Sequence, residues 1–487
     1  MKFYSLSSGV VSHLLSSTDG KELDLPFEVT EHETEIIHFP RSTFVLGRSG
    51  TGKSRKTTVL TMKLIQKEQQ YHFSSEGLHV IKNMPGCSKE TGLRQLFVTV
   101  SPKLCAAIKN HISNLMRFTC GGSFQGDCSA VDMHEIDDTT QFSNVPDSFI
   151  DVTSSSFPLV LTFQKFLMML DRSMENSYFD RFQDVREFSL GRGGTSSSIS
   201  LLVFIRTKEV NFERFNSLYW PHFNCNLTKR LDPSTVFTEI ISYIKGGLKD
   251  GKVCDGKLHR EDYVSLCEGR ASCLSRDRRE DIYDIYVDYE KKKIENGHFD
   301  LADFVNDLHV RLRQGLYEGD FIDFVYIDEV QDLTMRQIAL FKYMNIKALF
   351  YNEFLSESDS DKNDKTKEKG QPCVSEIFHL NQNFRTHAGV LNLSQSVVDL
   401  LYHYFPFSVD VLSPETSLIY GESPVLLESG NDENAIVTIF GNSGSIVCDD
   451  CARKEISNYV GKQALVLTIL ECKGLEFQVG IYVCRIF

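Results

Sequence analysis

Residues 47–54, Gly47-Arg48-Ser49-Gly50-Thr51-Gly52-Lys53-Ser54, fit the pattern G-x-x-x-x-G-K-[ST]. In such a loop the glycines let backbone N–H groups curl around an anion at the start of a helix, which attracts phosphate oxygens. Lys53 would reach the β- and γ-phosphates of a nucleotide, and the Ser54 hydroxyl would be a ligand of Mg²⁺. We therefore predict that Gly47 to Ser54 bind ATP with Mg²⁺. The simpler alternative is a Gly-rich turn without a ligand.

An acidic pair supplies the residue types that a phosphate loop needs to complete its chemistry. Asp328-Glu329 directly follows the apolar run Phe321–Ile327, which predicts a strand. Asp328 would hold Mg²⁺, and Glu329 would polarise an attacking water molecule. An acidic pair after a strand is common, so the prediction depends on the phosphate loop being present in the same chain.

Several elements must position these residues. Phe44–Leu46 predicts a short buried strand before the loop, and apolar residues from Val59 to Ile65 follow at helical spacing. Further apolar runs predict strands, and amphipathic runs predict helices. The strands are expected at Gln95–Val100, Leu159–Phe163 and Ala464–Thr468, and the helices at Leu104–Met116, Val236–Ile244 and Asp281–Lys293.

The long separation between Lys53 and Asp328 indicates an insertion inside the nucleotide-binding region. The segment 165–300 differs in composition, because aromatic residues and both charge signs interleave there. Aromatic residues around Trp220, near Arg214 and Lys229, could stack on nucleic-acid bases. The alternative, favoured for any single one of them, is that they form the core of a helical subdomain.

Composition sets wider limits. The chain of 487 residues predicts about two to four domains. Its net charge of −14 argues against charge-driven binding of the whole molecule to nucleic acid or anionic membranes. No run of about 18 or more apolar residues predicts a membrane span, and the N-terminus does not resemble a secretory signal. The 13 scattered cysteines fit a reducing compartment, so we expect an intracellular protein of the nucleus or cytoplasm.

Short stretches in this order resemble the motifs of UvrD/Rep/PcrA-like superfamily 1 DNA helicases, and specifically the large eukaryotic UvrD-like group associated with TPR and ankyrin repeats. Asp328-Glu329-Val330-Gln331-Asp332 resembles motif II, and Gly47 to Ser54 resembles motif I. Four further stretches resemble motifs Ia, Ib, IV and V: Thr99-Val100-Ser101, Thr162-Phe163-Gln164, Asn383-Phe384-Arg385-Thr386, and Thr468 with Lys473-Gly474-Leu475-Glu476-Phe477.

The resemblance implies an α/β fold of two RecA-like P-loop NTPase domains, the first interrupted by a mainly helical insertion and the second truncated. The implied boundaries are an N-terminal lead-in at 1–39, the first domain at 40–164 and 301–355, the insertion at 165–300, a charged linker at 356–372, and the second domain at 373–487.

The resemblance also implies roles for individual residues. Arg385 would reach the γ-phosphate as an arginine finger, Gln331 would act with the acidic pair, and Glu476 would lie near the nucleotide sugar. Single-stranded DNA would run past Thr99, Ser101, Thr162, Phe163 and Thr468. The expected function is an ATP-dependent DNA helicase or translocase that moves 3′ to 5′ and hydrolyses ATP with Mg²⁺, without a membrane partner.

Three departures from the family pattern weaken that expectation, and the first is that no convincing adenine-reading Gln motif precedes Gly47. The chain lacks a Gly-Asp-x-x-Gln stretch after Asp332, which would be motif III, and the arginine-bearing motif VI. ATP binding would then be retained while hydrolysis is slow and unwinding weak or absent. Two alternatives stay open: a helicase-derived ATP-binding switch or scaffold module without unwinding activity, and a phosphate-loop ATPase unrelated to nucleic acid.

Overall fold

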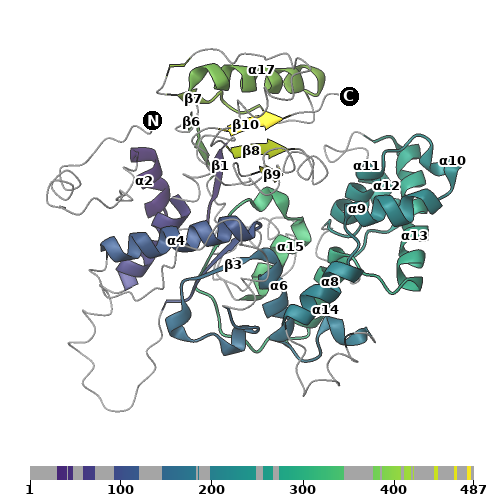
Figure 1. Ribbon diagram of the computed structural model, residues 1–487, viewed down its shortest axis with the longest axis horizontal. Helices are drawn as coiled ribbons and strands as arrows, with labels where there is room; N and C mark the ends of the chain where they lie inside the picture. The colour runs from purple at the N-terminus through teal and green to yellow at the C-terminus, as the bar shows by residue number, and fades with distance from the viewer. Residues whose placement is uncertain are drawn as a thin grey trace, which may run out of the picture.

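The computed structural model describes fifteen stretches and one single residue of the chain. They are 30–40, 42–47, 59–71, 93–119, 145–182, 185, 198–247, 256–266, 274–344, 377–383, 387–406, 411–417, 420–421, 444–447, 466–468 and 480–483. For 114–119, 198–200, 444–447, 466–468 and 480–483 only the backbone is described. Helices and short strands alternate through these residues, with a group of helices at one side of the molecule (Figure 1).

A three-stranded parallel sheet organises the first part of the chain. Strand β2 (Gln95–Thr99) lies between β3 (Leu159–Thr162) and β4 (Phe324–Ile327). These strands confirm the runs predicted at Gln95–Val100 and Leu159–Phe163. The third begins later than the predicted run Phe321–Ile327, because Asp323 accepts a hydrogen bond from the Arg94 backbone N–H at 2.9 Å and is held outside the strand.

Helices cover both faces of this sheet, as the alternation of side chains along a strand requires. On one face Phe97, Val160 and Tyr326 pack against Leu64 and Ile65 of the helix at 59–71 and against α4 (Pro102–Thr119). On the other face a larger core joins Leu96, Val98 and Leu161 to α6 (Phe163–Arg172), α8 (Ser198–Lys208) and α14 (Leu301–Arg313). The sheet is thus the middle layer of three.

A second parallel pair joins two distant parts of the sequence. Strand β1 (Phe44–Gly47) pairs with β5 (Ile377–Leu380), with Gly47 opposite Leu380. Both strands contact α2 (Glu31–His38) and the start of the helix at 59–71, where Ile36, Val59 and Phe378 share one core. Strand β5 follows the charged segment 356–372 in the sequence, yet its partner is the strand that precedes the phosphate-loop motif.

The segment between β3 and β4 is helical in its described residues. Its own core runs from Val210 to Tyr289, whereas α6 and α8 belong to the core beneath the sheet. The longest helix, α13 (Arg276–Glu295), confirms the helix predicted over Asp281–Lys293. Its neighbours are α9 (Phe212–Arg214), the π-helical turns Phe215–Tyr219 and Glu239–Ile244, α10 (Cys225–Thr228), α11 (Pro233–Thr238) and α12 (Arg260–Ser265). Four of these helices, α9, α10, α11 and α12, gather with α13 at one side of Figure 1.

The remaining elements are short except for α17 (Ala388–Tyr404). A parallel sheet of order β10-β8-β9 is formed by Gly480–Val483, Gly444–Val447 and Val466–Thr468, and β6 (Gln382–Asn383) pairs with β7 (Thr416–Ser417). Single turns of helix lie at Phe149–Asp151, Ser154–Ser156, Tyr178–Arg181, Trp220–His222, Val330–Asp332, α15 (Met335–Ala339) and Leu340–Met344. The described strands are all in parallel pairs with helices between them, an α/β arrangement; that they form RecA-like domains stays a prediction.

Candidate functional site

The phosphate-loop motif begins at the end of β1. Gly47 is the last residue of that strand. Arg48, Ser49, Gly50, Thr51, Gly52, Lys53 and Ser54 lie outside the described residues, as do Arg385 and Glu476. The structure therefore bears on the candidate site through the ends of the loop and through the acidic pair.

Asp328 and Glu329 stand at the carboxyl end of β4. The backbone N–H of Asp328 donates to the Val98 carbonyl at 2.9 Å, which continues the pairing of β4 with β2 by one residue. Both acidic side chains are buried, Asp328 with 6% and Glu329 with 7% of their surface exposed. A buried carboxylate is costly unless a cation or hydrogen-bond donor compensates it. This position is thus one at which a bound cation would be stabilised.

Glu329 has an unusual backbone conformation. Its φ of 55° and ψ of 38° are left-handed, which costs free energy for a residue with a Cβ and is uncommon outside glycine, Asn and Asp. The conformation turns the chain out of β4 into the short helix Val330–Asp332, and the Asp328 carboxylate accepts the Glu329 backbone N–H at 3.0 Å. The Gln331 side-chain amide donates to the Glu329 carboxylate. Gln331 thereby orients the carboxylate that the sequence assigned to water activation.

The helix at 59–71 runs antiparallel to β2 and β4. Its Leu64 carbonyl and Glu68 carboxylate accept hydrogen bonds from the side-chain amide of Gln95, the first residue of β2. From Glu68 back to Val59 the helix rises about 13 Å, and β2 extends about 13 Å from Gln95 to Thr99. Val59, the first described residue of this helix, therefore lies level with the carboxyl ends of β2 and β4. Asp328 and Glu329 occupy that same edge.

Thr99 ends β2 at this edge. Its side chain is buried, and its hydroxyl has no hydrogen-bond partner among the residues that the structure describes. A buried hydroxyl without a partner costs roughly 1–3 kcal/mol. The carboxyl edge of the sheet thus offers an oxygen ligand or donor beside the acidic pair, a neighbour that the sequence placed only on a nucleic-acid path.

Other residues expected on that path have structural roles instead. The Ser101 hydroxyl accepts the Leu104 backbone N–H at the start of α4, and Thr162 accepts the Lys165 backbone N–H as the N-cap of α6. Phe163 is buried in the core beneath the sheet, 5.8 Å from the ring of Phe166. A base cannot stack on a buried ring, so the expectation for Phe163 is wrong. Thr468 ends strand β9, of which only the backbone is described.

The aromatic residues of the helical segment form a core. Phe215 and Tyr219 are buried and contact Tyr289 edge-on, at 5.4 and 5.3 Å between ring centroids. Trp220 packs against the same core. Arg214 donates to the Glu209 carbonyl at 2.8 Å. The interpretation as a subdomain core is therefore correct for these residues, and base stacking is not supported.

Two comparisons bear on identity. The chain matches no model of a protein family. It is 25% identical over 618 residues to the human protein named "TPR and ankyrin repeat-containing protein 1", in an alignment that covers 98% of this chain and 20% of that relative. The chain thus spans about a fifth of the length of this curated relative.

These comparisons contradict the assignment to UvrD/Rep/PcrA-like superfamily 1 helicases. The relative's name carries the two kinds of repeat and no helicase activity, and no helicase family model matches. The expected function falls with that assignment: neither ATP-dependent DNA unwinding or translocation nor a helicase-derived module is retained. The physical reason is that a motif of three to five residues carries little information by itself.

The described residues also limit what the relative's name implies. TPR and ankyrin units are about 33 or 34 residues long and contact their immediate neighbours in the array. Here β2 pairs with β3 and with β4, which lies beyond the helical segment. This sheet is therefore not a tandem array of such units. No helix in the described part of the chain is long and apolar enough to cross a membrane.

Proposed function

We propose that this chain binds ATP with Mg²⁺ at a phosphate loop and is unrelated to nucleic-acid unwinding. The single observation that carries the proposal is that the helix after the motif and the acidic pair meet at the carboxyl ends of β2 and β4. Val59, the first described residue of the helix that follows the motif, lies level with the carboxyl ends of β2 and β4, where Asp328 and Glu329 are buried. Ligands bind characteristically at the carboxyl ends of parallel strands, and phosphates at the start of the helix that follows.

The residues at this edge fit a magnesium nucleotide. Mg²⁺ prefers oxygen ligands, usually one or two from the protein together with phosphate oxygens. Asp328 offers a buried carboxylate, Ser54 a hydroxyl within the sequence motif, and Thr99 a buried hydroxyl without a partner among the described residues. Lys53 would neutralise the β- and γ-phosphates. When bound, the metal ion would supply charge neutralisation at the transferred phosphate.

Hydrolysis at the same site is the second part of the proposal. Glu329 would accept the proton of an attacking water molecule, and Gln331 would hold the Glu329 carboxylate in place through the hydrogen bond between their side chains. Arg385, two residues after β6 in the sequence, would act as the arginine finger. We expect slow hydrolysis of ATP, because the sequence after Asp332 contains no recognisable motif that would sense the γ-phosphate.

Calorimetric titration of the purified chain with ATP tests the binding. We expect saturable binding with Mg²⁺ present, weaker binding after chelation of Mg²⁺, and a loss of at least about tenfold in affinity in Lys53→Ala, which corresponds to a single charge-assisted contact of 1.4 kcal/mol or more.

Lys67→Ala is the matched control, since Lys67 lies on the helix at 59–71 that follows the motif, with its ammonium 3.4 Å from the exposed Gln70 side chain. Its affinity for ATP should equal that of the unchanged chain. Equal binding by Lys53→Ala and Lys67→Ala, or no binding by the unchanged chain, would refute the proposal.

A further inference from the structure

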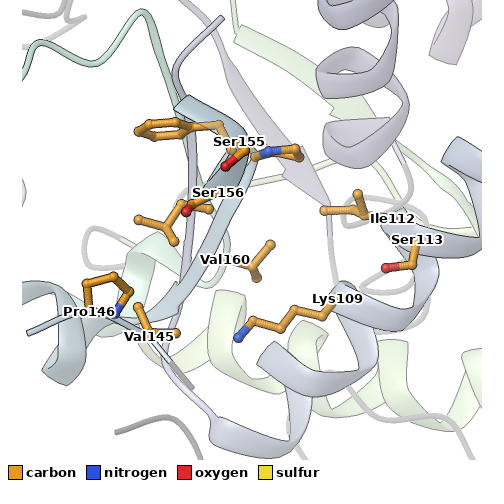
Figure 2. Close-up of a pocket in the computed structure, with 11 residues that line it drawn as sticks. Lys109, Ile112, Ser113, Val145, Pro146, Ser155, Ser156 and Val160 are labelled. Carbon is orange, nitrogen blue, oxygen red and sulfur yellow. The ribbon is translucent and has the colours of Figure 1, made fainter. Parts of the chain in front are cut away.

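A pocket opens between α4 and the beginning of β3, away from the carboxyl edge of the sheet. Its cavity volume is about 380 Å³ (Figure 2). Leu159 and Val160, the first two residues of β3, form part of its wall, whereas Thr162 ends that strand at the opposite edge, where the acidic pair lies. The pocket is therefore separate from the candidate nucleotide site.

The wall of the pocket is mainly apolar with a few polar groups. Val145, Phe157 and Val160 are among its apolar side chains. Lys109 and Ser113 enter from α4, four residues apart and therefore on one face of the helix. Figure 2 shows Lys109 extending across the space toward Val145, with Ser155 and Ser156 on the far rim. An apolar wall with a small number of polar groups is typical of small-molecule sites.

Positively charged side chains gather at the end of the pocket that Lys109 reaches. Asp147, beside the wall residue Pro146, forms ion pairs with Lys165 at 3.0 Å and with Arg172 at 3.8 Å. Lys109 has no ion-pair partner in the part of the chain that the structure describes. Burial lowers the pKa of Lys165, Asp147 raises it, and the charges of Arg172 and Lys109 lower it again. Lys165 and Arg172 thus bring two positive charges to Asp147, and Lys109 lies near enough to Lys165 to lower its pKa.

We propose that this pocket binds a small organic anion, a molecule with one apolar ring or short chain and one phosphate or carboxylate group. Lys109 would hold the anionic group, with the Ser113 hydroxyl on the same helix face as a donor. The apolar part would lie against Val145, Phe157 and Val160. A cavity of about 150 Å³ is enough for benzene, so this pocket has room for a ring together with its anionic group.

Phenyl phosphate and benzoate are suitable probes, and benzyl alcohol is the neutral control of similar size. The measurements use the full chain carrying Lys53→Ala, so that the phosphate loop does not contribute, and they detect binding by ligand-observed NMR. We expect both anions to bind, and Lys109→Met to weaken each by about tenfold or more, as loss of a charge-assisted contact does. Benzyl alcohol should bind equally to both variants.

Two further variants localise the effect. Ser113→Phe fills the pocket and should abolish binding of both anions, whereas Lys103→Met removes a charge from the same helix outside the pocket and should leave binding unchanged. Binding of phenyl phosphate alone would identify the ligand as a phosphate, and binding of both probes an anion of either kind. The proposal is refuted if neither anion binds at about 10 mM, or if Lys109→Met binds the anions as well as Lys103→Met does.

Discussion

The side-chain amide of Gln95 donates to the Leu64 carbonyl at 3.1 Å and so ties the first residue of β2 to the helix that follows the phosphate-loop motif. The same amide group donates to Glu68 at 2.7 Å and accepts the Tyr326 hydroxyl of β4 at 2.8 Å. Gln95 is completely buried. The Gln95 side chain thereby fixes the position of the helix at 59–71 along β2 and β4. Thr99 and Asp328 lie at the carboxyl ends of these two strands.

Replacing Gln95 by leucine should destabilise the chain and loosen the candidate site. Gln95→Leu leaves the buried Tyr326 hydroxyl and the Glu68 carboxylate without this partner, which we expect to lower the free energy of unfolding by about 1–3 kcal/mol. Urea denaturation measures this. The affinity for magnesium ATP should fall as well, because the helix at 59–71 would no longer be held in one position along β2 and β4.

Gln70→Leu is the control for that experiment, because Gln70 is exposed on the same helix and accepts a hydrogen bond from Lys67 at 3.4 Å. Its unfolding free energy should change by less than about 0.5 kcal/mol. Equal stability of the two leucine variants would show that the Gln95 hydrogen bonds do not hold the helix.

Asp328 and Glu329 should separate into a binding and a turnover function. In Asp328→Asn the affinity for ATP should become independent of Mg²⁺, because the carboxylate ligand is lost. In Glu329→Gln binding should persist while ATP turnover falls by about 10²- to 10⁴-fold, the usual contribution of a general base. Calorimetry with and without Mg²⁺ and a phosphate-release assay measure the two.

Asp320→Asn is the matched acid-to-amide control, since Asp320 pairs with Arg94 at 2.8 Å near the other end of β4. It should leave affinity and turnover unchanged. If Glu329→Gln loses binding rather than turnover, the assignment of water activation to Glu329 is wrong, while the binding proposal stands on Lys53 and Asp328.

The parts of this site that depend on local sequence patterns could be predicted from the sequence. The strands at 95–99 and 159–162 follow from runs of β-forming apolar residues, and the acidic pair after β4 follows from the change of polarity at Asp328. Gln95 was the missed signal: a polar residue at the start of a buried strand must find hydrogen-bond partners, and those partners are distant in sequence.

Other features of the site could not be predicted from the sequence, because they depend on packing between residues that are distant in the chain. The left-handed conformation of Glu329 is set by the turn from β4 into the next helix rather than by residue type. Phe163 fits a short motif that contacts nucleic acid in helicases, yet its ring is buried in the core beneath the sheet. The helicase assignment failed in the same way, because it added up short local matches.

A buried cluster of charges in the helical segment was equally invisible in the sequence. The Lys245 ammonium lies 2.6 Å from Asp300 and Asp303 and 2.9 Å from Glu290, and Lys293 contacts the same carboxylates. The three carboxylates are close enough to hold a metal ion. Lys257, with its ammonium 2.8 Å from Glu290, joins Lys245 and Lys293, so three ammonium groups balance the three carboxylates. We therefore interpret the cluster as a structural ion network that joins the end of the π-helical turn Glu239–Ile244 to α13 and α14.

Removing one ammonium from this cluster should be strongly destabilising. Lys245→Met leaves the buried Asp300 and the partly buried Glu290 and Asp303 with Lys293 as their closest cation, and breaking a buried ion pair costs about 3–5 kcal/mol. Lys292→Met, which removes a half-exposed pair with Asp288 from the same helix α13, should cost less than about 1 kcal/mol. Equal losses in the two variants would show that the cluster does not stabilise the fold.

The cluster also predicts how stability depends on acid. Burial raises the pKa of Glu290, but Lys245 and Lys293 outweigh burial and lower it to about 2, from 4.5 in the unfolded chain. The unfolded state therefore binds the proton first as the pH falls. The stabilisation is complete above about pH 4.5 and is lost as the pH falls toward 2. In Lys245→Met the folded-state pKa of Glu290 should lie closer to that of the unfolded chain, so the loss should be smaller and should end at a higher pH; unfolding at a series of pH values measures this.

His309 of α14 should remain uncharged in the folded protein at mildly acidic pH. Its imidazole is buried, its Nε2–H donates to the Arg336 carbonyl at 2.8 Å, and its ring meets that of Tyr343 at 5.6 Å. Burial lowers the pKa of His309 to about 3; the hydrogen bond to the Arg336 carbonyl opposes that shift, and the Arg336 charge adds to it. The unfolded chain therefore takes up a proton near pH 6.5 that the folded chain excludes.

The consequence is a loss of stability on mild acidification. The contribution of neutral His309 is complete above about pH 6.5 and declines by about 1.4 kcal/mol per pH unit below it. Between pH 7 and 5 the unchanged chain should lose roughly 2 kcal/mol more unfolding free energy than either His309→Gln or His309→Leu. His309→Gln keeps a donor for the Arg336 carbonyl and His309→Leu does not, so the two differ in absolute stability but share the flatter dependence on pH. If the unfolding free energy of these variants falls with pH as steeply as that of the unchanged chain, His309 binds its proton equally well in the folded and the unfolded protein.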